Sequence, residues 1–251
     1  MSTSSLRSAE SFAADGEAYA RGPRPAGAAL SYRSMSDPFP MPETAGPLLR
    51  IGLCSSLSRG FLRELIRHVR VERDAPALSF LDGTPQEVMK AASRGEIDVG
   101  FVYGPHDWAS LESEELWREQ LMVLMPDGYW LSRDSEVKST ALRAETFLVA
   151  GDLAERETHM QLLEHAIGGA PAVLAVPVER ATVIDLVSLG FGLAVTIESA
   201  LGVFHPGVNY RPIGAPVEPI AFHAVWRGAN DSEELARFLE TARALAALRR
   251  A

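Results

Sequence analysis

Residues 78–103 read LSFLDGTPQEVMKAASRGEIDVGFVY and place a strand, a helix and a second strand in close succession. The run LSFL predicts a strand, and the GTP that follows favours a helix start, with threonine as N-cap and proline at the first helical position. The glycine at position 95 ends the helix, and the nearly continuous apolar run after it is typical of a strand covered on both faces. A strand–helix–strand unit of this kind belongs to a mostly parallel sheet.

The same alternation extends in both directions along the chain. Residues 49–54 predict an opening strand, Ser55 and Ser56 after it have helix-capping chemistry, and a helix follows with apolar residues at helical spacing. Further strands are predicted at 120–125, 147–150, 172–176, 193–197 and 220–226, and further helices at 85–94, 155–167, 182–189 and 233–248. These elements form two α/β sets, and the fold class is therefore predicted to be α/β.

Composition narrows the class of protein. The 251 residues are 47% hydrophobic and 23% charged, with a net charge of −9, which disfavours direct DNA binding by this chain. The single cysteine excludes an internal disulfide. We find neither a secretory signal nor an apolar stretch long enough to cross a membrane, so a cytoplasmic protein is expected. Residues 1–47 are rich in Ser, Ala, Gly and Pro and predict a disordered tail before a domain at 48–251.

Three short patterns do not carry a catalytic or metal-binding function. The six histidines show no i, i+4 pair with a nearby carboxylate, so no metal site is expected. Ser135-Glu-Val-Lys138 fits a penicillin-recognising nucleophile motif but lies in a polar loop. Gly190-Phe-Gly192 follows a helix instead of a strand, which favours a helix stop over a dinucleotide fingerprint. We expect no enzyme activity and no cofactor.

Physical reasoning places a ligand site at three strand-to-helix turns. Ligands of open parallel α/β sheets lie outside the carboxyl ends of the strands, where helix N-termini favour anions. The candidate turns are Ser55–Ser56–Leu57, Gly83–Thr84 and Arg180–Ala181–Thr182. Arg180 could pair with a carboxylate, although a surface salt bridge fits it equally well. Thus the hypothesis is a small organic acid as ligand.

Several segments, in order and at the correct spacing, resemble the effector-binding domain of LysR-type transcriptional regulators across nearly all of 49–245. They are LRIGLCSSLSRGFLRELIRHVR at 49–70, the quoted stretch with its G-x-x-D-x-x-[IF] pattern, EELWREQLMVLMPDGYWL at 114–131, ATVIDLVSLGFGLAVTIES at 181–199, VNYRPI at 208–213 and AFHAVWRGANDSEELARFLETAR at 221–243. The family commonly has proline where Arg63 and Ile197 stand, which concerns backbone detail. Residues 1–47 do not fit the winged helix-turn-helix and linker helix of family members, so a receptor domain without a DNA reader is expected.

The resemblance implies two Rossmann-like lobes of the type 2 periplasmic-binding-protein-like fold, with the effector between them. Lobe I would comprise about 48–125 and 216–251, and lobe II about 126–215. Ser56 and Thr84 match family-type contact positions, although helix capping alone also explains both. The other candidates are Tyr103, which fits the core better than a cavity wall, and Gly151 with Asp152 after the first strand of the second lobe. Asp152 would argue against a simple anion or require an amine on the ligand.

The resemblance also implies partners. Family domains pair side by side, so a homodimer or a mixed dimer with a complete LysR-type regulator is expected, with no membrane association. The alternatives are a solute-binding receptor of transport type, a non-functional truncated regulator and, least favoured, an enzyme such as a small-acid dehydratase.

Overall fold

The computed structural model describes residues 47–250 except 73, 105–109, 152 and 170. The predicted tail, apart from its last residue, and the candidate Asp152 therefore lie outside the described residues. The elements are β1 (Leu48–Leu53), α1 (Phe61–Val71), β2 (Ala77–Asp82), α2 (Pro85–Arg94), β3 (Val99–Tyr103), β4 (Glu112–Glu119), β5 (Leu121–Pro126), η1 (Trp130–Arg133), α3 (Ser139–Leu142), β6 (Thr146–Val149), α4 (Leu153–Ile167), β7 (Ala172–Ala175), α5 (Arg180–Ser188), β8 (Ala194–Ile197), η2 (Glu198–Gly202), β9 (Val208–Pro212), β10 (Ile220–Trp226) and α6 (Glu233–Arg250).

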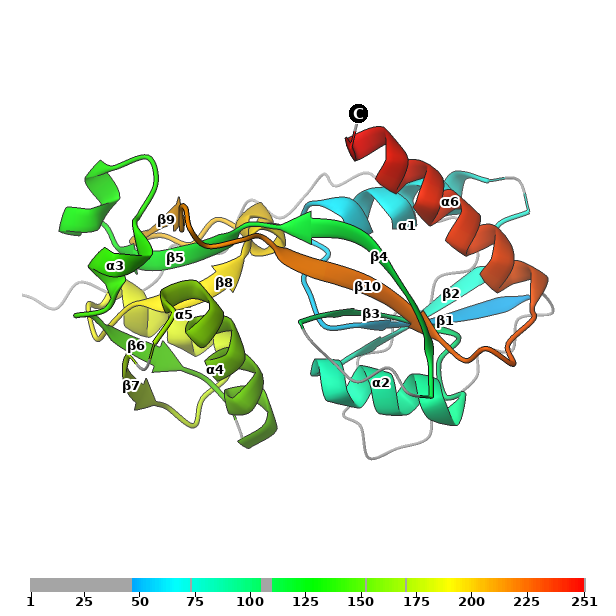
Figure 1. The fold of residues 1–251 in the computed structure, drawn as a ribbon, viewed down its shortest axis with the longest axis horizontal. Helices are drawn as coiled ribbons and strands as arrows, with labels where there is room; N and C mark the ends of the chain where they lie inside the picture. The colour runs from blue at the N-terminus through cyan, green and yellow to red at the C-terminus, as the bar shows by residue number, and fades with distance from the viewer. Residues whose placement is uncertain (1–46, 73, 105–109, 152, 170, 251) are drawn as a thin grey trace, which may run out of the picture. The chain divides into compact units, whose positions relative to one another are not determined.

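The first lobe is a five-stranded sheet with the order β2-β1-β3-β10-β4. Strand β1 pairs parallel with both β2 and β3, as the alternation of strands and helices predicts, whereas β10 runs antiparallel to β3 and β4. Helices α1 and α6 cover one face of this sheet and α2 covers the other (Figure 1). The parallel half brings the carboxyl ends of β1, β2 and β3 to one edge.

Two contacts fix α2 and its connection to the sheet. A Cβ added to Gly100 would lie 2.5 Å from Val88 Cγ1, so the glycine permits the close approach of α2 to β3. At the other end, Asp98 accepts two hydrogen bonds from the Arg50 side chain, at 3.1 and 2.7 Å. Burial is the largest single effect on the pKa of Asp98 and raises it. The hydrogen bonds and the charge of Arg50 together outweigh burial, so the pKa of Asp98 is lowered. The aspartate of the G-x-x-D pattern therefore ties the α2–β3 connection to β1.

The second lobe contains a three-stranded sheet, β8-β5-β9, and a parallel pair, β6-β7. A bridge between Phe147 and Leu193 joins β6 to the residue before β8. Helix α5 packs over β5, β6 and β8, where Val187 lies in a small apolar cluster with Leu124 and Leu148. Helix α4 also contacts β6 and β8.

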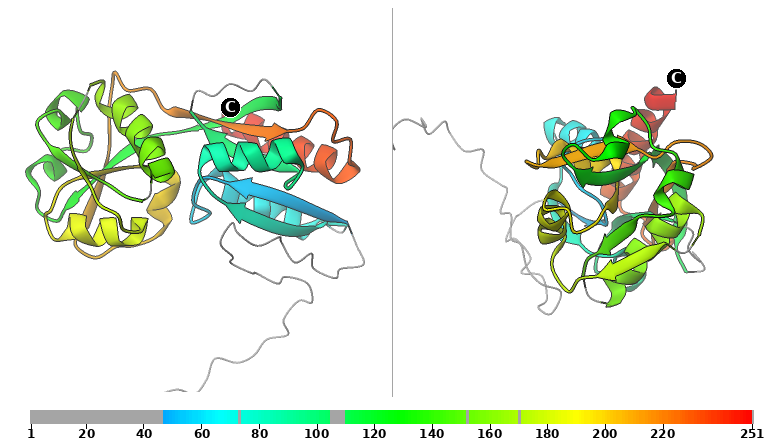
Figure 2. Two further views of the ribbon diagram at one scale, coloured as in Figure 1. Left: turned by 90° about the horizontal axis from the view of Figure 1, so that it is seen from below. Right: turned by 90° about the vertical axis from the view of Figure 1, so that its left-hand side faces the viewer.

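Strand β5 belongs to the second lobe, which corrects the expected boundary near 125. Residues 121–124 pair with β8 and residues 122–126 with β9, so the chain leaves the first lobe at Gln120. The chain returns between Pro212 and Ile220, and both passages can be followed in Figure 2. The strand was misassigned because its partners are distant in sequence, whereas its own apolar pattern fits either lobe. The predicted α/β class and two-lobe arrangement are confirmed.

Candidate ligand site

The carboxyl ends of β1, β2 and β3 place Cys54, Asp82 and Tyr103 at one edge of the first-lobe sheet. Leu53 pairs with Asp82 on β2 and with Phe101 on β3, and the backbone N–H of Gly83 donates to the Leu53 carbonyl at 3.0 Å. The Cys54 thiol is buried and donates to the Phe101 carbonyl at 3.1 Å. The sequence-predicted edge therefore exists, with a thiol, a carboxylate and a phenol along it.

The loop after β1 does not cap helix α1, contrary to the expected role of Ser55 and Ser56. The helix begins at Phe61, its N-cap is Gly60, and no side chain caps it. Instead, Ser56 Oγ accepts from the backbone N–H of Ser58 at 3.0 Å. The Ser55 side chain is 6% exposed, and its hydroxyl has no hydrogen-bond partner among the described residues. A buried hydroxyl without a partner costs free energy, so Ser55 is the loop residue best suited to accept a ligand.

The third residue of that turn, Leu57, makes contacts within the protein, and ligand contact by it stays a prediction. Its side chain packs against the core, and its carbonyl accepts from the Arg63 guanidinium at 3.2 Å.

Thr84 forms the predicted N-cap of α2, and this role engages its polar atoms. The Glu87 carboxylate accepts from the Thr84 backbone N–H at 2.8 Å and from the Thr84 hydroxyl at 3.0 Å. The hydroxyl in turn accepts from the Glu87 backbone N–H at 3.3 Å, which completes a capping box. Because Glu87 already places a negative charge at this helix start, α2 is a weaker anion site than the sequence suggested.

Arg180 is the cation that faces the sheet edge from the second lobe. It is the first residue of α5, its side chain is largely exposed, and its guanidinium donates to His159 Nε2 on α4 at 3.0 Å. The position of Arg180 at a helix start adds the partial positive charge of the helix N-terminus to its own charge. Arg180 is therefore the strongest candidate for pairing with a carboxylate.

The electrostatic effects of Arg180 show that it lies near all three strand ends. Burial raises the pKa of Asp82, of the Cys54 thiol and of the Tyr103 phenol, and in each case the charge of Arg180 acts in the opposite direction. The charge of Arg180 therefore acts on all three strand ends, and ligand contact by Ser55, Thr84 and Arg180 together stays a prediction.

His159 remains uncharged beside Arg180. Burial and, to a smaller extent, the Arg180 charge lower the pKa of the imidazole to about 4, and the backbone of Ala150 acts in the opposite direction. Since Nε2 accepts the bond from Arg180, it carries no proton in this arrangement. A neutral acceptor orients the guanidinium without cancelling its charge, which leaves that charge available to a ligand.

The remaining candidates contribute less. Gly151 has a positive φ of 90° and its N–H donates to the Val178 carbonyl at 3.1 Å, so this N–H is occupied by the backbone. Thr182 is exposed on α5, and the N-cap of that helix is Glu179, without a side-chain cap bond. Ligand contact by either residue stays a prediction.

Several hydrogen bonds hold the lobes together around this site. Thr158 Oγ1 on α4 donates to Gln86 Oε1 on α2 at 3.4 Å, and Ser58 Oγ donates to the Ser199 carbonyl. At the crossing itself, the buried Glu119 accepts from the Trp117 indole at 2.9 Å and from the Ser199 backbone N–H at 2.9 Å. A change in the ligand site can therefore reach the passage between the lobes through a small number of polar contacts.

Sequence reasoning missed Asp82 and His159. Asp82 directly precedes Gly83–Thr84 at the carboxyl end of a parallel strand, so the rule that selected the turn also points to it. His159 carried no comparable signal because its contact with Arg180 depends on how α4 and α5 pack. Among the described residues, no group of three metal-ligating side chains is arranged to hold an ion, and no helix is long and apolar enough to cross a bilayer.

Comparison with known proteins identifies similar sequences. A family model for the LysR substrate binding domain matches residues 43–247. The HTH-type transcriptional regulator XapR of Escherichia coli (strain K12) is 27% identical over 169 residues, which cover 66% of this chain and 56% of XapR. The Hca operon transcriptional activator HcaR of the same strain is 23% identical over 197 residues, which cover 76% of this chain and 65% of HcaR. The chain thus spans less than two thirds of either regulator.

Solved structures show the same fold. Full-length BenM superposes with a TM-score of 0.71 at 22% identity, covering 82% of this chain and 69% of BenM. The BenM effector binding domain with its effector benzoate gives 0.70 at 22% identity, with coverages of 81% and 93%. The reduced OxyR regulatory domain of Pseudomonas aeruginosa gives 0.65 at 22% identity, with coverages of 81% and 98%. These likenesses agree with the predicted type 2 periplasmic-binding-protein-like fold.

Proposed function

The chain belongs to the LysR substrate-binding domain family, and on this premise we propose that it senses a small organic acid and acts in transcription regulation through DNA-binding partners. The observation that carries the organic acid is Arg180, whose guanidinium donates to a neutral His159 and whose charge acts on Asp82 at the end of β2. The BenM effector domain was solved with benzoate, itself a carboxylate. A carboxylate bound by both Arg180 and the Ser55 hydroxyl, which has no partner among the described residues, would draw the two lobes toward a common ligand.

The signal would arise from a change in how the lobes are arranged. A ligand shifts such an equilibrium only by the difference between its affinities for the two arrangements, about 1–3 kcal/mol in typical regulators. The hydrogen bonds of Ser58, Gln86 and Glu119 join the two lobes, so a new arrangement of the lobes would change them.

The proposed partner is a second copy of this domain or a LysR-type relative. Strand β2 is the outermost strand of the first-lobe sheet, and β7 is the outer member of the β6-β7 pair. All four β7 residues are exposed, with Val173 36% and Leu174 44% accessible. An exposed edge with apolar side chains is suited to association with another subunit.

Calorimetry with the full chain tests the organic-acid proposal. Benzoate and succinate should bind saturably, and Arg180→Met should weaken the better ligand at least about ten-fold, because a hydrogen bond to a charged group contributes about 1.5–3 kcal/mol. Arg67→Met is the matched control, since Arg67 is exposed on α1. Equal affinity in Arg180→Met and the native chain, or binding confined to neutral and cationic compounds, would contradict the proposal.

A further inference from the structure

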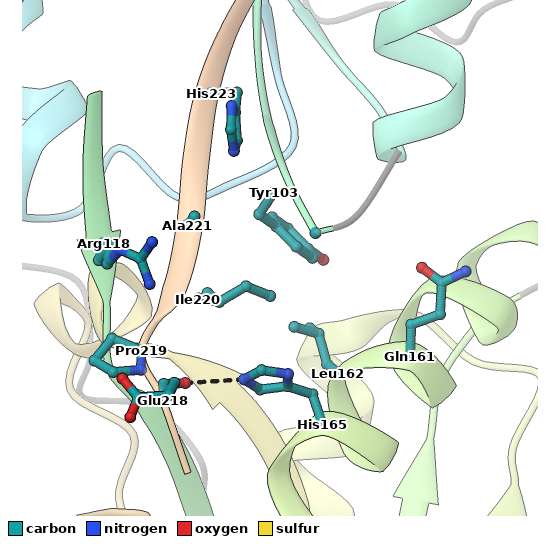
Figure 3. A pocket seen from close by; sticks show the side chains of 11 residues that line it. Tyr103, Arg118, Gln161, Leu162, His165, Glu218, Pro219, Ile220, Ala221 and His223 are labelled. Atoms are coloured by element: carbon teal, nitrogen blue, oxygen red, sulfur yellow. Dashed lines mark hydrogen bonds between the residues drawn. The ribbon is translucent and has the colours of Figure 1, made fainter. Parts of the chain in front are cut away.

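A pocket lies beside Tyr103, where β10 and β4 continue the first-lobe sheet beyond β3. It has a volume of about 290 Å³ and is lined by the end of β3, by β4 and β10 of the first lobe, by the segment that leads into β10, and by helix α4 of the second lobe (Figure 3). This volume is close to the lower limit of small-molecule pockets, about 300 Å³, and suits a molecule with one ring.

The apolar part of the pocket is built by flat or branched side chains. Tyr103 is 5% exposed, Leu162 on α4 is 4% exposed, and Ile220 begins β10 with 7% exposed. The Tyr103 ring is held by a tilted contact with Phe222, with ring centroids 5.3 Å apart. The walls are therefore fixed by the core of the first lobe and by α4, and they suit a planar apolar surface.

The charged groups at the pocket are one guanidinium and two carboxylates. The Arg118 guanidinium reaches it, but Glu115 already binds this group through Nε at 2.9 Å and Nη2 at 3.0 Å. Glu115 raises the pKa of Arg118, and Glu218 at the same rim acts in the same direction. An added anion would meet two carboxylates beside one guanidinium, so the pocket favours an uncharged ligand.

The pocket also offers a ligand both hydrogen-bond donors and hydrogen-bond acceptors. His165 Nε2 lies 2.9 Å from the Glu218 carbonyl, which can only accept, so Nε2 carries the proton and Nδ1 of a neutral ring is an acceptor. Gln161 on α4 supplies an exposed amide with both a donor and an acceptor, and its side chain lies beside the pocket in Figure 3.

We propose that this pocket is a second ligand site, which takes an uncharged, planar aromatic compound with a donor and an acceptor side by side, such as an aromatic amide. Because its walls come from both lobes and from β10, a ligand here biases the arrangement of the lobes and changes the affinity of the strand-end site. The binding itself does not depend on the proposed function, whereas the coupling does.

Benzamide is the direct probe, since it has the shape of benzoate without the charge. Titration of the full chain, followed through backbone amide NMR shifts, should show saturable binding with the largest shifts in 161–165 and 219–223. Gln161→Leu should weaken benzamide at least about five-fold, and Ala221→Phe, which fills the pocket from β10, should abolish its binding. Glu157→Leu, an exposed substitution on α4 outside the pocket, is the control and should leave the affinity unchanged.

The same titrations separate this site from the strand-end site. Arg180→Met should lower the affinity for benzoate and leave the affinity for benzamide unchanged. The pocket variants Gln161→Leu and Ala221→Phe should lower the affinity for benzamide and leave the affinity for benzoate unchanged. Each affinity is measured with the second ligand at a saturating concentration. Absence of saturable benzamide binding, shifts centred on the strand ends, or benzamide affinity unchanged by both pocket variants would overturn the proposal. Failure of benzoate to bind would contradict the proposed function alone. If Ala221→Phe fails to fold, Gln161→Leu and the location of the shifts decide the matter.

Discussion

The Arg180–His159 pair combines a charge with a partner that does not neutralise it. A carboxylate at position 159 would satisfy the guanidinium and remove most of its attraction for an anionic ligand. The imidazole instead accepts one hydrogen bond and, with a pKa near 4, is uncharged at neutral pH. Below that pKa the ring would gain a proton, lose its lone pair at Nε2 and repel Arg180.

The pH dependence of stability should therefore reveal His159. In the unfolded chain a histidine has its ordinary pKa of 6.5, whereas burial lowers that of folded His159 to about 4. Between these values the unfolded state binds the proton and the folded state does not, so the free energy of unfolding falls as the pH drops through this window. The full loss is about 3 kcal/mol at most, at 1.36 kcal/mol per pKa unit.

We expect His159→Gln, whose amide oxygen can accept from Arg180 but cannot be protonated, to lose at least about 1 kcal/mol less than the native chain between pH 7 and pH 4.5. Urea unfolding at the two pH values measures the difference. His68→Gln, on the exposed side of α1, is the control. A native chain whose loss of stability equals that of His159→Gln would show that the ring is not held neutral.

At the scale of elements, the start of α2 depends on one threonine and one glutamate. Thr84→Ala removes the hydroxyl from the capping box and should lower the free energy of unfolding by about 1 kcal/mol. Thr84→Ser keeps a hydroxyl at the N-cap and should retain most of the native stability. Chemical denaturation measures both variants. Equal stability of Thr84→Ala and the native chain would mean that Glu87 alone caps the helix.

The helix ends also show which elements could be predicted from the sequence. The Thr-Pro start and the Gly95 stop of α2 were predicted correctly because capping is local chemistry, and Gly95 has the expected left-handed φ of 69°. Ser55 and Ser56 offer the same chemistry, but α1 begins only at Phe61. The intervening loop instead contacts η2 of the second lobe through Ser58, which is a tertiary contact that no local pattern encodes.

Strand β4 illustrates a second limit. Its sequence, ESEELWRE, alternates poorly between apolar and polar residues, and the strand lies at the edge of the sheet, where β10 is its partner among the described strands. It was therefore predicted only through the family resemblance. The same reason explains why β5 was placed in the wrong lobe, since strand pairing is set by residues far away in sequence.

At the scale of the whole molecule, the exposed apolar edge of β7 is a surface suited to a partner subunit. We expect the native chain to sediment as a dimer, and Leu174→Lys should weaken the association at least about ten-fold because a charge must then be buried or repelled at the contact. Asp185→Lys, an exposed position on α5, is the matched surface control. A native chain that sediments as a monomer at high concentration would contradict this prediction.

Part of the candidate site could be predicted from the order of strands and helices in the whole chain. The rule for parallel sheets located the ends of β1, β2 and β3, and the helix start at Arg180 followed from the same rule in the second lobe. The role of His159 and the engagement of Thr84 in its own cap depend on packing between helices, which the sequence pattern does not reveal.

The proposed function requires a single organic acid that contacts both lobes, through the β1 loop and the start of α5. The most direct measurement follows the backbone amides of 54–57 and 180–183 by NMR while benzoate is added to the full chain. We predict that both segments shift together with one dissociation constant, and that Arg180→Met abolishes the shifts in both. Shifts confined to one of the two segments, or two segments that saturate at different concentrations, would contradict a shared ligand.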